Sequence, residues 1–99
     1  MATLQIKIKK NGRIVDNHCR KTLSKKANDS VRWIAMDSGT FTVTFPDGSP
    51  FEESTFPDIS QGNSVASGPV RGTKYQTYKY VVTDAKGKVT DDPDILVDD

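Results

Sequence analysis

Short runs in which apolar and polar residues alternate dominate the chain and predict β-strands. Residues 3–9 place Leu or Ile at every second position, with Gln or Lys between them, and residues 40–45 alternate Phe and Val with Thr. Such a period of two puts one set of side chains on each face of a strand, so we expect the Phe and Val side chains to be buried. Further strands are expected at 31–36, 73–83 and 89–97. No stretch has a helical period, so the pattern predicts an all-β domain.

Turn-forming residues separate these runs. Asn11 and Gly12 follow the first alternation and predict a tight hairpin turn with two positive φ angles, after which the chain returns as a strand at 14–15. Asn28 is expected in the left-handed conformation. Residues 46–72 contain four of the five prolines together with many Gly and Ser residues. We therefore expect a long ordered loop there, with room for one short strand.

Length and composition favour one domain that spans residues 1–99. A chain of 99 residues can bury one hydrophobic core. Its single cysteine, Cys19, excludes an internal disulfide and a cysteine-based zinc site. No apolar stretch approaches the roughly 20 residues that cross a bilayer, and none forms the core of a signal peptide. We expect a cytoplasmic protein without a membrane partner; an exported protein whose signal peptide has been removed is the alternative.

Three segments resemble the cupredoxin family. Residues 28–33, Asn-Asp-Ser-Val-Arg-Trp, resemble the family's Gly-Asp-x-Val-x-Trp strand start, with Asn28 where Gly is usual. Residues 78–82 resemble the aromatic-x-aromatic strand that delivers the copper-binding cysteine, and residues 95–97 resemble the closing strand. The resemblance covers roughly residues 14–97 and implies a small Greek-key β-sandwich of about seven strands. An immunoglobulin-like sandwich fits the strand pattern almost as well.

The same resemblance implies where copper ligands should stand, and this chain lacks them. Phe41 occupies the position of the first histidine, and Val82 occupies that of the cysteine. Residues 84–93 should supply a histidine and usually a methionine, but contain neither. A blue-copper site needs two imidazoles and a thiolate, whereas the chain has one histidine in total. Copper electron transfer is excluded by ligand count, and we expect no cofactor.

No catalytic constellation stands out. His18 and Cys19 are the one reactive-looking pair, but neighbours on an extended chain point to opposite faces and do not form a nucleophile and its base. The aspartates at 91–99 lack the glycine and glutamate spacing of a calcium-binding loop. We therefore expect neither an enzyme nor a metal site.

The apolar residues of the 46–72 loop suggest a first function. Phe51, Phe56 and Ile59 either anchor the loop in the core or form an exposed recognition patch. Ordered loops on a sandwich commonly carry protein recognition. Our first hypothesis is a non-enzymatic protein-interaction or structural module, which docks a protein partner through these residues or self-associates through its sheet edges.

A basic cluster suggests the alternative, weak binding of single-stranded nucleic acid. Its members are Arg20, Lys21, Lys25 and Lys26, and Tyr75, Tyr78 and Tyr80 could supply stacking faces. Residues 1–32 contain nine basic and two acidic side chains, whereas residues 33–99 contain five basic and eleven acidic ones. Because the two halves of a sandwich interleave, this asymmetry either cancels in space or survives as a dipolar surface.

Overall fold

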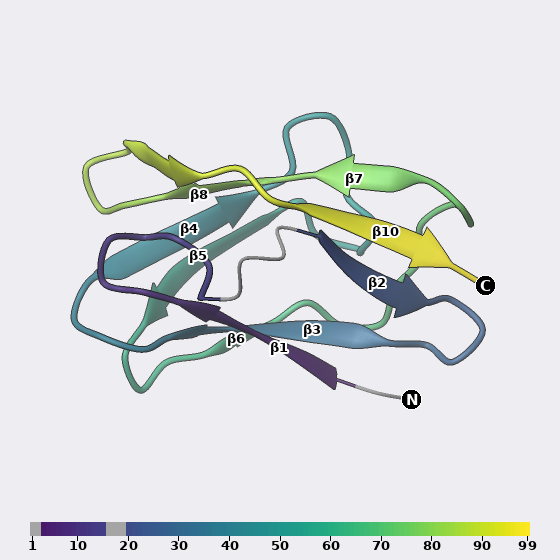
Figure 1. Cartoon of the computed structure of the whole chain (residues 1–99), viewed down its shortest axis with the longest axis horizontal. Helices are drawn as coiled ribbons and strands as arrows, with labels where there is room; N and C mark the ends of the chain where they lie inside the picture. Colours follow the sequence, from purple (N-terminus) through teal and green to yellow (C-terminus); the bar gives the residue numbers. More distant parts are fainter. Residues whose placement is uncertain (1–2, 16–19) are drawn as a thin grey trace.

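The computed structural model of the chain describes residues 3–15 and 20–99, with only the backbone of residue 20 (Figure 1). The described residues contain strands and no helix that could span a membrane. The strands are β1 (Thr3–Ile8), β2 (Arg20–Ser24), β3 (Ser30–Ala35), β4 (Thr40–Thr44), β5 (Thr55–Ser60), β6 (Val65–Ala66), β7 (Thr77–Lys79), β8 (Val81–Thr83), β9 (Val89–Asp91) and β10 (Asp94–Asp98).

The strands form the two layers of a β-sandwich (Figure 1). One layer is the three-stranded sheet β1-β3-β6, in which β1 and β3 run parallel. The other layer combines the sheets β5-β4-β8-β9 and β2-β10-β7. These two sheets follow one another because β7 leads into β8 across Tyr80, and β9 leads into β10 across residues 92–93. The predicted all-β sandwich is therefore confirmed.

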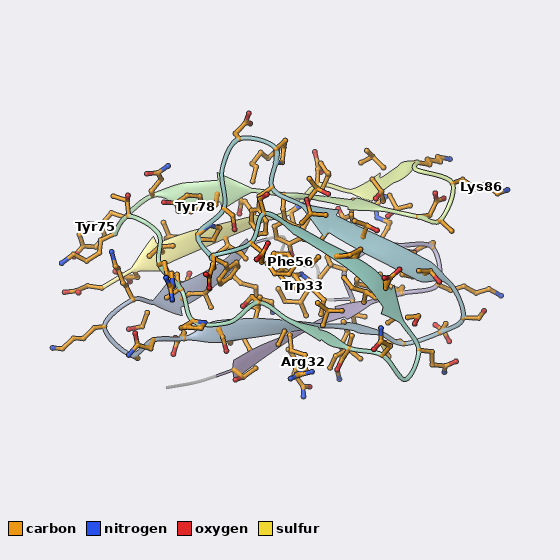
Figure 2. The ribbon with its side chains drawn as sticks, turned by 180° about the vertical axis from the view of Figure 1, so that it is seen from behind. Arg32, Trp33, Phe56, Tyr75, Tyr78 and Lys86 are labelled. Carbon is orange, nitrogen blue, oxygen red and sulfur yellow. The ribbon has the colours of Figure 1, made fainter. Side chains whose placement is uncertain are left out.

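An aromatic cluster fills the space between the layers. Trp33, on β3, is fully buried and contacts aromatic rings that come from the opposite layer and its loops. Its ring centroid lies 4.9 Å from that of Phe56, 5.8 Å from that of Tyr80 and 6.2 Å from that of Phe51. Most of these pairs meet edge to face, the arrangement that the ring quadrupoles favour. The cluster joins both layers at the middle of the molecule (Figure 2).

Alternation predicts the central strands well. Buried and partly exposed side chains alternate along all of β3, and β4 buries Phe41 and Val43 as expected. Phe45 directly follows β4 and is buried too. Asn28 has φ of 56°, which confirms the left-handed turn before β3.

The first turn differs from the predicted one. Gly12 has φ of 83°, but Asn11 does not have a positive φ. The amide of Gly12 donates to the carbonyl of Lys9, and the amide of Lys9 donates to the carbonyl of Arg13, both at 2.8 Å. This is the pattern of a longer hairpin loop with one left-handed glycine. The return consists of an isolated bridge between residues 8 and 14 rather than a strand.

Three long segments were divided differently from the prediction. The stretch at 73–83 yields β7 and β8, which are separated at Tyr80, and Tyr75, with φ of 65°, lies before both. The stretch at 89–97 yields β9 and β10, which are separated at residues 92–93, where Pro93 cannot donate to a ladder. Residues 46–72 contain β5 and β6 instead of one strand. β2 lies in a polar stretch without alternation. These divisions explain why the described residues hold ten strands, whereas about seven were expected.

We predict that Phe51→Ala destabilises the domain by about 3–5 kcal/mol, because it leaves a cavity beside Trp33. Urea denaturation measures the change in the free energy of unfolding. The matched control is Met36→Ala, whose side chain is exposed and which should change stability by less than about 0.5 kcal/mol. A loss below about 1 kcal/mol for Phe51→Ala would contradict the packing described here.

Candidate functional site

Of the two alternatives for Phe51, Phe56 and Ile59, the structure shows core anchors, so the hypothesis of an exposed recognition patch is wrong. Phe51 is 5% exposed, Phe56 is 4% exposed and Ile59 is fully buried. The reason is the pairing of β5 with β4, which sets Phe56 opposite Val43 and Ile59 opposite Phe41, with all four side chains turned to the opposite layer. These residues anchor the 46–72 segment and offer no surface to a partner.

The predicted basic cluster lies beside acidic residues. β2 runs parallel to β10, with Arg20 opposite Asp94 and Ser24 opposite Asp98. The amide of Lys25 donates to the carbonyl of Asp98 at 2.8 Å, so the turn that holds Lys25 borders the acidic end of β10. Here the charges of the two halves of the sequence interleave, as expected for a sandwich.

One other member of the cluster, Lys21, is less available than the sequence suggested. Lys21 is half-buried, and the side chain of Arg20 lies outside the described part of the chain. Lys26, in the same turn as Lys25, is exposed. Among the three cations of the cluster whose side chains are described, Lys25 and Lys26 are exposed, both in the turn next to the acidic strand.

The three tyrosines do not form one stacking platform. Tyr80 is buried in the aromatic cluster, and Tyr78 is half-buried with its hydroxyl accepting the amide of Thr73 at 2.8 Å. Tyr75 alone is well exposed, at 70%. Its amide donates to the carbonyl of Val97 at 2.6 Å, so it lies on the opposite side of β10 from β2.

The other candidate groups give no reactive site among the residues that the structure describes. His18 and Cys19 lie outside them. Within residues 3–15 and 20–99 no three His, Cys, Asp or Glu side chains are grouped closely enough to hold a metal ion.

The two positions that resemble copper-ligand positions are part of the core. Phe41 and Val82 are buried on the neighbouring strands β4 and β8. Gly39 packs against Phe41 so closely that an added Cβ would lie 3.2 Å from its ring. A phenyl ring and an isopropyl group have no lone pair to donate to a metal. The residues present therefore do not fit a copper ion.

The segment that should complete such a site, residues 84–93, starts with a compact turn and continues as β9. The carboxylate of Asp84 accepts the amides of Lys86 and Lys88 at 2.9 and 3.0 Å. The amide of Asp84 in turn donates to the carbonyl of Lys88 at 2.9 Å. The carboxylate and the amide of Asp84 therefore both bond to the backbone of this same turn.

Solved structures with a similar fold include two copper(I) forms of amicyanin variants. They align with 97% of this chain and 82% of their own, at 16% and 15% identity, with TM-scores of 0.64 and 0.66. A pseudoazurin from Sinorhizobium meliloti aligns with 100% of this chain and 76% of its own, at 18% identity and a TM-score of 0.55. The chain has a cupredoxin-like fold. No protein-family model and no curated protein sequence matches it.

One end of the cupredoxin-like sandwich carries a surface that the sequence did not reveal. We call it the loop-end surface, and it consists of residues 9–11, 15, 36–40 and 84–86. These residues lie at the end of the sandwich that is farther from the C-terminus (Figure 1). A hollow of about 580 Å³ is lined by Lys9, Lys10, Asn11, Val15, Met36 and Asp37. A second hollow of about 220 Å³ adjoins it at Lys10 and reaches the turn at 84–86.

Hydrogen bonds hold the parts of the loop-end surface in place. The amide of Met36 donates to the carbonyl of Ile8 at 3.0 Å, which ties the end of β3 to that of β1. The hydroxyl of Thr90 donates to the carbonyl of Gly12 at 2.9 Å, and the amide of Ile14 donates to the Asp91 carboxylate at 2.9 Å. The first turn is therefore fixed to β9 of the opposite layer.

We predict that Gly12→Ala destabilises the domain more than Gly87→Ala. Both glycines have φ near 80°, so both substitutions carry a left-handed penalty of about 1–2 kcal/mol. Only at Gly12 would the new Cβ overlap with the side chain of Thr90, whereas no atom lies within 4 Å of it at Gly87. Thermal unfolding of the two variants measures the difference. Equal losses would mean that the first turn is not packed on β9.

Proposed function

We propose that the chain is a non-enzymatic protein-interaction module built on a cupredoxin-like scaffold without a copper site. The observation that carries the proposal is the pair of buried hydrocarbon side chains, Phe41 and Val82, at the positions of two expected copper ligands. The similar amicyanin structures are copper(I) forms, and in this chain those positions contribute to the core instead. Without a metal at these positions, the outer surface of the domain is the part that can bind a partner.

The sheet edges favour a discrete docking surface over pairing between copies. Pro57 and Asp58, which has φ of 62°, interrupt the edge strand β5. β6 has only two residues, and the amide of Val15 covers part of the β1 edge by donating to the carbonyl of Lys7. Short, irregular or covered edges are the features by which natural sheets avoid edge-to-edge association.

A location in the cytoplasm stays a prediction.

We predict that copper does not stabilise the protein. A metal that binds the folded state at a concentration 100 times its Kd adds about 2.7 kcal/mol to the free energy of unfolding. We expect no shift in the urea midpoint with Cu(II) or Cu(I), and no thiolate-to-copper absorption band. Cys19→Ser is the control, because it removes the one thiol that could scavenge copper. A stoichiometric copper complex that survives in this variant would contradict the proposal.

We further predict that the tagged protein captures a discrete protein partner from its native lysate at low salt. The ultraviolet absorbance spectrum of the eluate should be that of protein without nucleic acid. A nucleic-acid signal that disappears at high salt would instead favour the basic cluster, because phosphate contacts are strongly salt-dependent.

A further inference from the structure

We propose that the loop-end surface binds an acidic protein segment, which inserts an apolar side chain beside Met36 and Val15. This inference rests on the proposed function and adds to it the location of the interface and the chemistry of the partner. Three features of the described residues carry it: the hollow, the charges around it, and the absence of exposed aromatic rings there.

The larger hollow offers an apolar contact in a polar surrounding. Met36 is 46% exposed although it directly follows the buried end of β3. Val15, on the neighbouring chain segment, is half-buried and lines the same hollow. Its volume of about 580 Å³ lies in the range of small-ligand pockets, which is large enough for an apolar side chain. Methionine adapts its shape to different apolar partners, which suits a recognition surface.

Positive charge surrounds this hollow. The turns at this end carry exposed Lys9, Lys10, Arg13, Lys86 and Lys88, and fewer carboxylates lie beside them: Asp37, Asp84, and Asp91, which accepts the amide of Ile14. None of these five cations forms an ion pair within the described part of the chain.

Asp84, moreover, already accepts two backbone amides of its own turn. The net charge of the whole chain is only +1, so the excess of cations at this end is local. Such a rim attracts acidic partners and repels basic ones.

An acidic protein segment fits this surface better than nucleic acid does. Single strands are bound through exposed aromatic rings, and the one aromatic residue at the loop end, Phe41, is buried. The exposed Tyr75 lies at the opposite end of the molecule from Lys86 (Figure 2).

An acidic protein segment also fits the loop-end surface better than an anionic membrane does. A continuous layer of phosphates would face Asp37 as well as the lysines of the larger hollow, whereas a peptide can place its acidic side chains beside Lys9 and Lys10 alone. Lipid surfaces select dense clusters of Lys and Arg, whereas this rim mixes both signs around an apolar centre.

The test starts with a random dodecapeptide library displayed on phage and selected on the purified domain. We expect enriched peptides in which Asp and Glu flank a Leu, Phe or Met. The best peptide is then synthesised with a fluorescent label, and its Kd is measured by anisotropy. Amide chemical shifts recorded by NMR during the titration should change at residues 9–11, 36–40 and 84–86.

Two charge-reversal variants locate the interface. Lys10→Glu combined with Lys86→Glu should weaken binding at least about tenfold, because both cations border the hollows. Lys25→Glu combined with Lys26→Glu introduces the same charge change beside β10 and should alter Kd less than about twofold. Met36→Ser should also weaken binding at least about tenfold, at unchanged salt dependence, because it removes the apolar contact.

Several results would overturn the inference. These are enrichment of peptides without acidic residues, equal losses in the two charge-reversal variants, or chemical shifts that change at the opposite end. Binding to phosphatidylserine vesicles with no peptide enriched would assign the surface to a membrane and would overturn it too. A lysate partner that both charge-reversal variants still capture would leave the proposed function intact but place its interface elsewhere. Capture of no partner would count against the proposed function itself.

Discussion

The packing of Trp33 against aromatic rings from the opposite layer holds this structure together. β3 carries Trp33 into the centre of the sandwich, where it meets Phe56 of β5, Tyr80 between β7 and β8, and Phe51 of the preceding loop. Each ring buries a large apolar area, and each aromatic pair adds about 0.5–1.5 kcal/mol beyond that burial. The indole nitrogen has no hydrogen-bond partner among the described residues, so burial of the ring outweighs the cost of one unsatisfied donor there.

This cluster explains why a proline- and glycine-rich segment is ordered. Residues 46–72 contain too little alternation to form a strand pattern, but Phe51 and Phe56 fix them to Trp33. The same contacts remove both side chains from the surface. The residues that looked most suited to recognition are therefore needed for the stability of the core. Any partner has to bind to other parts of the molecule.

The positions that resemble copper-ligand positions follow the same logic. Phe41 and Val82 extend the core toward the loop end, so hydrocarbon side chains fill both positions. Short hydrogen-bonded turns cover that end and present lysines around Met36. The chain thus combines a cupredoxin-like fold with core side chains at these two positions.

The sequence by itself determined the all-β class, the central strands, and the lack of copper ligands, because alternation and ligand identity are local properties. It left open whether Phe51 was core or surface, since an apolar residue in a loop looks the same in either role. Only the tertiary structure placed β2 beside the acidic β10, and brought Lys10, Met36 and Lys86 to one end. Those arrangements depend on how distant strands pair across the layers, and residues far apart in the chain carry no local signal of that pairing.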